Sequence, residues 1–287
     1  MQIGVVFPQT EIGADVAALR AYGQAVEELG FGHILAYDHV LGADPAVHEG
    51  WAGSYDIHST FHEPLVLFGY LAAITSLELV TGIVIAPQRQ TVLVAKQAAE
   101  VDLLSRGQFR LGLGLGWNPV EYEALGQDFT TRGRRLEEQI ALLRRLWTER
   151  SVTFTGEFDR VTGAGLAPLP VQRPIPIWMG GQSPPAYLRM GRLADGWFPQ
   201  MPPGRQLADA MAMVAAGAIE AGRSPEDLGM EGRAQWTGDA DDIVERAEQW
   251  RNAGATHLAI NTMKVGHASV DDHLAALATT ADALDLR

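Results

Sequence analysis

The sequence predicts an α/β fold in which one (β/α)8 barrel of the TIM type spans residues 1–287 as a single domain. Short apolar runs alternate eight times with longer amphipathic stretches, and the composition does not change along the chain. The length is also usual for one α/β barrel. A doubly wound open sheet is the main rival. Its usual sign, a G-x-G-x-x-G turn after the first strand, is missing from residues 8–13.

Eight short apolar runs are predicted as strands, because a parallel strand covered on both faces is apolar throughout. They are residues 3–7, 33–37, 79–85, 109–113, 175–179, 196–198, 230–236 and 257–261. Stretches with apolar residues spaced three or four apart are predicted as the helices that follow these strands. They are residues 15–29, 63–75, 92–104, 132–147, 184–193, 206–221, 241–253 and 270–283.

Two insertions interrupt the alternation. Residues 41–61 follow the second strand and are rich in glycine, histidine and aromatic residues. Because loops after barrel strands form the catalytic mouth, we expect this insertion to be a lid over the substrate. Residues 151–173 follow the fourth helix, and their pattern predicts a small hairpin on the opposite side of the barrel.

The composition narrows the classes of partner. A formal net charge of −13 opposes binding to polyanions, so we expect no nucleic-acid partner. The absence of cysteine removes disulfides, thiolate zinc sites and cysteine nucleophiles. Residues 1–7 lack the features of a signal peptide, and no apolar run is long enough to span a bilayer. We therefore expect a cytoplasmic protein with no membrane partner and a small-molecule substrate.

Asp38 and His39 directly follow the second strand and are the candidate catalytic residues. A carboxylate beside an imidazole can orient the ring, tune its pKa and assist a proton transfer that accompanies hydride movement. The alternative is an aspartate that caps a helix beside a solvent-exposed histidine. Both interpretations are compatible with the residues alone.

Two glycine-rich segments are candidate cofactor sites. Gly180-Gly181-Gln182-Ser183 ends the fifth strand and precedes a proline-initiated helix, where free backbone N–H groups could bind a phosphate. The alternative is a turn that only joins strand to helix. Gly112, Gly114 and Gly116 leave one face of the fourth strand bare. A flat ring could lie on that face, or the glycines could allow close packing inside the barrel.

Metal and serine chemistry are poorly supported. His39, His58, His62 and His257 could meet at a barrel mouth, but no H-x-H follows the first strand and no H-E-x-x-H occurs. No G-x-S-x-G nucleophile turn is present either. The sequence therefore predicts no metal site.

The ordered motifs resemble the bacterial luciferase-like superfamily, and in particular its F420-dependent oxidoreductase branch. Each motif is short, but together they run through most of the chain in one order. They are Ala36-Tyr37-Asp38-His39, Glu63-Pro64, Thr81-Gly82-Ile83-Val84, residues 101–107, residues 112–118, residues 180–183 and Ala194-Asp195-Gly196-Trp197.

The resemblance implies a deazaflavin cofactor, coenzyme F420, laid across the barrel mouth. Gly82 and Ile83 match the position of a non-proline cis peptide that supports the ring from behind. The resemblance further implies that the phosphate is held at Gly180, Gly181, Gln182 and Ser183, and that Asp38 and His39 lie near the reactive carbon. Gly114 and Asn118 belong to the strand-four segment that would face the ring.

One departure from the family bears on the substrate. In the sugar-phosphate dehydrogenases of this branch a glutamate after strand four acts as acid, and here the matching position is Trp117. The chain also has only two lysines, Lys96 and Lys264. We therefore expect a small, uncharged and partly apolar substrate, walled by aromatic side chains. The candidates are Trp51, Tyr55, Trp117 and Trp236.

Three functions stay open on the sequence alone. The first is hydride transfer between F420 and the substrate, with His39 assisting a proton. The second is a monooxygenase that uses reduced FMN, because the same superfamily contains both. The third is a non-catalytic flavin-binding protein on the same barrel, because fold does not imply activity. The resemblance also implies a homodimer.

Overall fold

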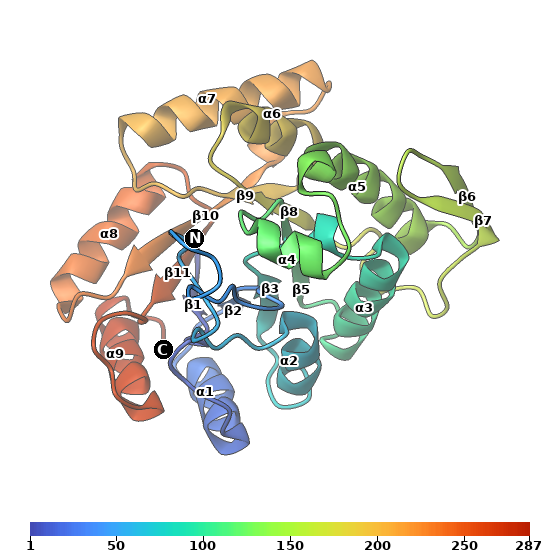
Figure 1. Ribbon diagram of the computed structural model, residues 1–287. Coiled ribbons are helices and arrows are strands. Elements are labelled where there is room, and N and C mark those ends of the chain that lie inside the picture. The colour runs from blue at the N-terminus through green and yellow to red at the C-terminus, as the bar shows by residue number, and fades with distance from the viewer.

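Parallel strands close into a barrel because the first strand, β1 (Gln2–Val6), pairs with the last, β11 (His257–Asn261), and β3 (Glu78–Thr81) pairs with β5 (Phe109–Gly114). The computed structural model describes residues 1–287 and shows this ring from the end (Figure 1). From β1 the order continues in one direction through β2 (His33–Ala36) and β3 (Glu78–Thr81). In the other direction it runs through β10 (Gly229–Gln235), β9 (Gly196–Phe198), β8 (Ile177–Gly180), β5 (Phe109–Gly114) and β4 (Val84–Ile85). The predicted (β/α)8 barrel is confirmed.

Helices surround the strands, and each buries the face that packs on the barrel. None of them is both long and apolar enough to cross a membrane. They are α1 (Val16–Glu28), α2 (Pro64–Leu71), α3 (Thr91–Leu104), α5 (Arg132–Thr148), α6 (Pro184–Leu193), α7 (Arg205–Glu220), α8 (Ala240–Asn252) and α9 (Val270–Ala283). Short 3-10 helices are η1 (Ala86–Gln88), η2 (Phe129–Thr131) and η3 (Pro225–Asp227).

The structure corrects the sequence prediction in three elements. The predicted strand 79–85 is broken into β3 and β4 by the bend at Gly82 and Ile83. The predicted strand 175–179 begins only at residue 177, because Pro174 and Pro176 have no N–H for a ladder bond. The segment between β5 and α5 contains a helix that was not predicted, α4 (Pro119–Ala124).

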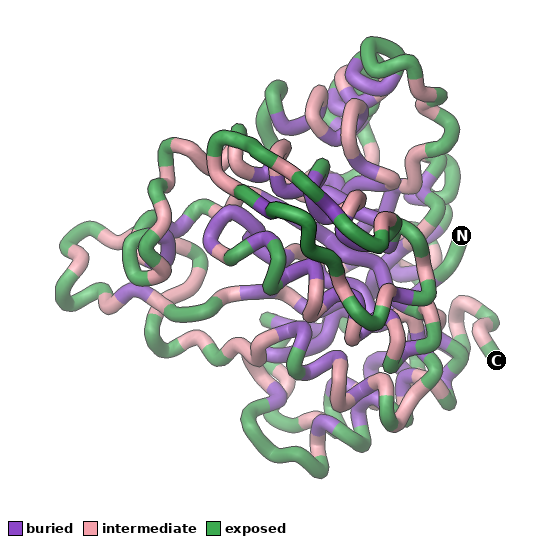
Figure 2. Tube along the Cα trace, turned by 90° about the vertical axis from the view of Figure 1, so that its right-hand side faces the viewer, coloured by how far each residue is buried: buried purple, intermediate pink, exposed green.

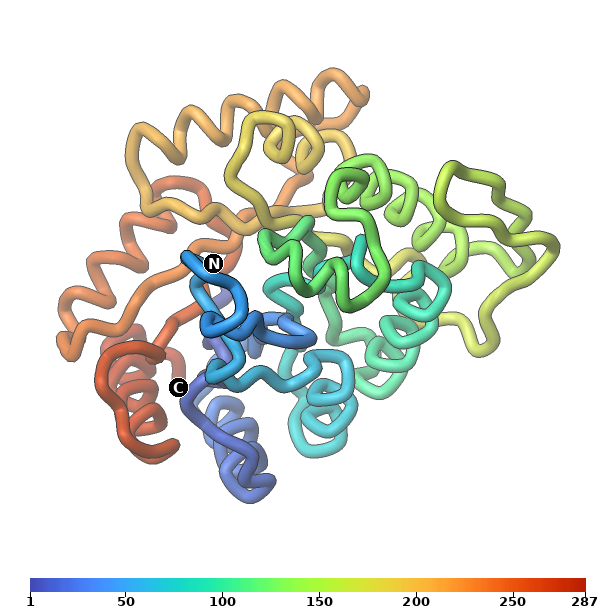
Figure 3. Tube along the Cα trace, viewed as in Figure 1, coloured from blue at the N-terminus to red at the C-terminus, as the bar shows by residue number.

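The two insertions differ in structure. Residues 41–61 contain turns but no helix or strand, and they lie across the middle of the ring in Figure 3. The second insertion holds the predicted hairpin, formed by antiparallel β6 (Val152–Thr155) and β7 (Arg160–Ala164). Glu138 on α5 accepts the backbone N–H groups of residues 157–159 at the hairpin turn. This hairpin packs beside the barrel (Figure 1). Its turn reaches the mouth-side starts of α3 and α5, where Asp159 accepts a hydrogen bond from Thr91 and Glu157 pairs with Arg134. The expectation that the hairpin lies on the opposite side of the barrel is therefore wrong for its turn.

The buried segments run through the middle of the molecule (Figure 2), and their apolar side chains form two clusters. The larger cluster lies between the strands and the surrounding helices. A second, smaller cluster fills the inside of the barrel. Its members are Val6, Leu35, Val80, Trp178, Phe198, Ala259 and Met263.

Charged side chains fill the opposite end of the barrel interior, near the starts of the strands. Glu231 accepts hydrogen bonds from His33 Nε2 at 2.9 Å and from Arg110 Nη1 at 2.8 Å. Arg110 Nε also bonds Glu78 at 2.8 Å. The side chains of His33, Arg110 and Glu231 are at most 4% exposed. Such a buried cluster is stable only while its partners keep their charge states.

Acid should weaken this cluster in two steps. Burial and, after it, the nearby Arg110 charge lower the pKa of His257 to about 3. Burial raises the pKa of Glu231, but the charges of His33 and Arg110 outweigh this and bring it to about 2. In both cases the unfolded chain binds the proton more readily. Stability from His257 is therefore lost as pH falls from about 6.5 towards 3, and stability from Glu231 is lost below about 4.5.

We predict that the Tm of the wild type falls more steeply than that of H257Q between pH 6.5 and 4.5, measured by thermal unfolding. The ring of His257 lies beside that of His33 in the cluster, and in this window it gains a proton in the unfolded chain but stays neutral in the folded one. Replacing it should therefore flatten the profile. H58Q is the matched control, because His58 is exposed and outside the cluster, and it should follow the wild type. Equal slopes for H257Q and the wild type would contradict the assignment.

Candidate active site

A cavity of about 580 Å³ opens at the carboxyl ends of the barrel strands. The apolar cluster inside the barrel forms its floor through Leu35 and Phe198. Most residues that the sequence analysis selected line this cavity. They are Asp38, His39, Tyr55, Gly82, Ile83, Gly114, Trp117, Gly180, Gly181, Gln182 and Ser183.

One side of the cavity presents free backbone donors. The N–H groups of Gly181, Gln182 and Ser183 have no acceptor within the protein. The two prolines that follow have no N–H, and the next two N–H groups bond to the Ser183 carbonyl oxygen. The donors therefore lie in the turn before α6, and the first turn of the helix adds only its dipole. Three adjacent donors in such a turn suit an oxyanion.

The Gly82–Ile83 peptide bond is cis, as the family resemblance implied. The Ile83 side chain projects between the neighbouring strands. A Cβ at Gly114 would come within 2.6 Å of it, and a Cβ at Gly180 within 3.3 Å. These glycines therefore make room for the Ile83 side chain. For Gly114, this is the close-packing role that the sequence analysis gave as the alternative to a bare face for a ring. Gly114 and Ile83 still form part of the cavity wall.

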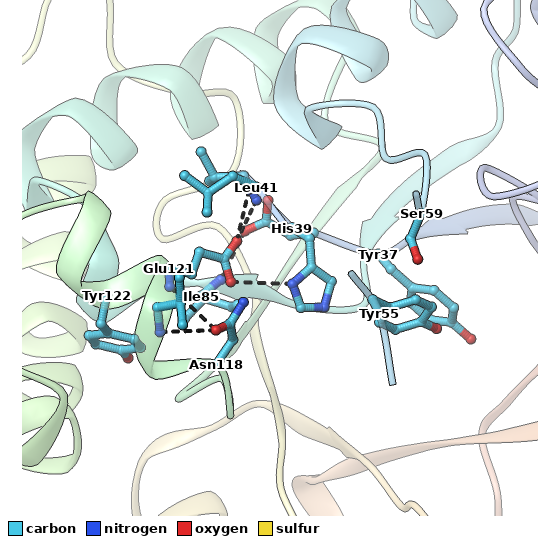
Figure 4. Close-up of polar contacts among 12 residues, drawn as sticks. Tyr37, His39, Leu41, Tyr55, Ser59, Ile85, Asn118, Glu121 and Tyr122 are labelled. Carbon is cyan, nitrogen blue, oxygen red and sulfur yellow. Dashed lines mark hydrogen bonds and ion pairs between the residues drawn. The ribbon is translucent and has the colours of Figure 1, made fainter. Parts of the chain in front are cut away.

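His39 is held by a carboxylate that the sequence analysis missed. Its Nδ1 lies 3.2 Å from Oε2 of Glu121, whose side chain is fully buried (Figure 4). The other oxygen of Glu121 accepts the N–H groups of Val40 and Leu41. Burial raises the pKa of Glu121, but the hydrogen bonds from His39 and Val40 outweigh it and bring the pKa below its usual value.

A charged Glu121 fixes the tautomer of neutral His39. The carboxylate only accepts, so His39 must donate its Nδ1 proton to it. The Nε2 atom then carries a lone pair, and it has no hydrogen-bond partner in the protein. His39 also contacts the rings of Tyr55, Phe61 and Trp117, with centroids 4.8–5.5 Å apart. The arrangement can take up or release a proton at Nε2.

The expectation that Asp38 orients His39 is wrong. One oxygen of Asp38 lies 2.7 Å from Arg89 Nη2, and the other accepts the N–H of Ile85 at 3.1 Å. Arg89 in turn bonds Glu63 at 2.9 Å. Burial raises the pKa of Asp38, and Arg89 opposes this. Both oxygens are occupied, so Asp38 fixes the β4 backbone beside the cavity instead of reacting in it.

Three other predicted site residues lie outside the cavity lining. Asn118 caps α4 by accepting the N–H groups of Val120 and Glu121, so its amide supports the helix that carries Glu121. Trp236 is 7% exposed and packs in the outer core. Trp51 lies in the lid, where its ring backs that of Trp117 at 5.7 Å and its Nε1 donates to Tyr55. Of the predicted aromatic wall, Tyr55 and Trp117 face the cavity.

The sequence analysis also missed the charged residues of the wall. Arg132, Arg233 and Lys264 line the cavity, and none of them forms an ion pair. Arg233 could have been found from the alternation of side chains in β10, since it shares the inward face with Glu231. Glu121 carried a signal as well, because Asn118 and Glu121 have capping-box spacing.

The histidines that a metal site would need lie apart. His39 is at the mouth, and His257 is beside the ionic cluster at the other end of the barrel. His62 bonds the carbonyl oxygen of Gly13. No group of three or more potential metal ligands is present.

Comparisons with known proteins identify a family and relatives of this chain. A family model described as luciferase-like monooxygenase matches residues 1–282. An F420-dependent hydroxymycolic acid dehydrogenase of Mycobacterium tuberculosis is 33% identical over 263 residues, which is 88% of this chain and 68% of that protein. An FMNH2-dependent dimethylsulfone monooxygenase of Pseudomonas fluorescens is 35% identical over 143 residues, 48% of this chain and 39% of that protein.

A solved structure has the same fold. The coenzyme F420-dependent tetrahydromethanopterin reductase of Methanopyrus kandleri gives a TM-score of 0.77 at 15% identity, covering 98% of this chain and 97% of that one.

We predict that neutral His39 carries its proton on Nδ1, as long-range ¹H–¹⁵N NMR of the histidine side chains would show. In E121Q the amide oxygen can accept the Val40 N–H, which leaves the amide NH2 group facing Nδ1 of His39. The NH2 group donates, so Nδ1 must accept and the Nε2–H tautomer should become populated. H62Q serves as a control for assignment, since it removes one ring signal and leaves the Glu121 contact intact. A wild-type ring protonated on Nε2 would refute the pairing.

Proposed function

The chain belongs to the luciferase-like monooxygenase family, and on that premise we propose that this oxidoreductase transfers a hydride between coenzyme F420 and a small organic substrate. The observation that carries the proposal is one cavity with two functional sides. Free N–H donors at residues 181–183 lie on one side, and His39 with an unpartnered Nε2 lies on the other.

The residues present fit a flavin-type cofactor. Gly181, Gln182 and Ser183 supply N–H donors for its phosphate without any lysine. Ile83 and Gly114 provide an apolar wall for a flat ring. When bound, a deazaflavin supplies a carbon that carries or accepts the hydride. The protein excludes water from the floor below it through Leu35 and Phe198.

His39 handles the proton that must move with the hydride. When an alcohol is oxidised, its carbon loses a hydride and its hydroxyl proton passes to Nε2 of His39, which leaves a carbonyl. In reduction, protonated His39 returns that proton to the carbonyl oxygen. Glu121 stabilises the charged ring in both directions because its carboxylate stays at Nδ1.

F420 is favoured over FMN because the F420-dependent relative aligns with more of this chain than the FMNH2-dependent relative does. The relative matched over 88% of this chain is named for F420, whereas the FMNH2-dependent relative matches over 48%. The N–H groups at residues 181–183 would donate hydrogen bonds to the phosphate of either cofactor. A monooxygenase that uses reduced FMN is therefore the second candidate function.

We predict that the purified protein binds F420 at least tenfold more tightly than FMN in fluorescence titrations. S183D should weaken F420 binding by about tenfold or more, because a carboxylate in the turn repels the phosphate. S224D is the matched control, since Ser224 caps η3 and Asp caps equally well. A preference for FMN would favour the monooxygenase, and binding of neither cofactor would contradict the site.

A homodimer is also part of this proposal. Val66 on α2 is 71% exposed, and Leu93 and Leu104 on α3 are 51% and 55% exposed. The two helices pack together, and exposed apolar side chains on neighbouring helices are typical of an interface.

We predict that light scattering gives twice the chain mass and that V66E shifts it to the monomer mass. Ile219 on α7 is 66% exposed and provides the control I219E, which should stay dimeric. A monomeric wild type would refute the dimer, and equal behaviour of V66E and I219E would refute this interface.

A further inference from the structure

Positive charge accumulates in the cavity of a strongly acidic protein. The chain has a net charge of −13, yet Arg132, Arg233 and Lys264 all line the cavity. Asp38 is the one carboxylate in the lining, and Arg89 already neutralises it. The three cations therefore have no counter-ion in the protein. An enclosed site with uncompensated charge attracts an anion.

Arg233 is held in place by neutral partners. Its Nη1 donates to the Tyr37 hydroxyl at 3.3 Å, and its Nη2 donates to Gln200 Oε1. These contacts fix the guanidinium across the mouth, from β10 towards the end of β2, without cancelling its charge. Such a fixed guanidinium suits a carboxylate or phosphate, which it can bind with two parallel hydrogen bonds.

Lys264 is placed beside the same group of side chains. Its Nζ lies 5.1 Å from the centroid of the Tyr55 ring, on which the ring of His39 also packs. Its backbone has φ = +63°, a left-handed conformation that side-chain-bearing residues rarely adopt. The backbone N–H donates to Glu11 at 2.7 Å, which helps to hold this conformation. Figure 4 shows Tyr37 and Tyr55 together on the open side of His39.

This cation pair is separate from the phosphate turn. Gly181 to Ser183 follow β8, and β1 stands opposite β8 in the ring. Lys264 follows β11, and Arg233 reaches the residue after β2, so both lie around the strands that flank β1. Arg132 begins α5, the helix that precedes β8 in the chain, and belongs to the phosphate side.

We propose that Arg233 and Lys264 bind an anionic oxygen group, a carboxylate or a phosphate, at the end of the substrate remote from the reacting carbon. The inference deepens the proposed function and rests on it. It also revises the expectation of an uncharged substrate, which was drawn from the scarcity of lysine. Arginine supplies the charge instead, and one of the two lysines lies in the cavity.

The test compares a matched pair of ketones, 4-oxopentanoate and 2-pentanone, by calorimetric titration of the protein saturated with oxidised F420. The wild type should bind the carboxylated probe at least tenfold more tightly. R233M and K264M should each reduce that preference several-fold, and the double variant should abolish it. R246M is the matched control, because Arg246 pairs with Asp242 on the outside of α8, and the preference should persist.

Two results would overturn the proposal. One is a wild type that does not distinguish the two ketones. The other is a tenfold loss of F420 affinity in R233M or K264M, with no change in affinity for a deazaflavin that lacks the phosphate chain. That result would assign the two cations to the cofactor. Failure of F420 binding would count against the proposed function alone, because the same ketone titrations on the cofactor-free protein still test the cation pair.

Discussion

The carboxylate of Glu121 joins two segments of the site that are distant in sequence, α4 and residues 39–41. It lies on α4, it binds His39 through one oxygen, and it accepts the N–H groups of residues 40 and 41 through the other. A buried carboxylate is stable only with such partners, so the contact cannot be loosened without a large penalty. The position of His39 and the start of the lid at residue 41 both depend on it.

The barrel interior separates stability from chemistry. Near the strand starts, Arg110 and Glu231 hold a buried ionic cluster, and the ring of Trp178 lies 4.4 Å from the Arg110 guanidinium. An apolar layer covers this cluster and forms the floor of the cavity. Because the apolar layer separates the two ends of the barrel, charged residues at the mouth can differ without changing the buried ionic cluster. That division is usual in barrel enzymes, whose functional groups lie at the strand ends.

The fold could be predicted because burial leaves a local pattern. A strand covered on both faces is apolar throughout, and its helix repeats every three or four residues, so the order of elements follows from the sequence. The Gly180–Ser183 turn was predictable for a similar reason, since glycine and proline have fixed local meanings. The broken strand at Gly82 could be placed only through the family resemblance.

The connections within the site could not be predicted in the same way. Asp38 and His39 are neighbours in sequence, but their side chains point in different directions. The Asp38 carboxylate therefore contacts Arg89, and the His39 imidazole contacts Glu121. The partner of each is decided by which loops the barrel brings to its mouth. Arg233 likewise became a cavity residue only once the inward face of β10 was known.

In the proposed function, a hydride passes in this cavity between a deazaflavin carbon and a substrate carbon while His39 moves the proton. It is tested most directly by single turnover of F420 reduced with deuterium at its reactive carbon, with a panel of ketones and mass analysis of the alcohol. We expect one deuterium in the product, no need for oxygen, and a rate about 10²–10⁴-fold lower in H39A. Oxygen uptake with reduced FMN, while reduced F420 stays unreacted under the same panel, would contradict the account.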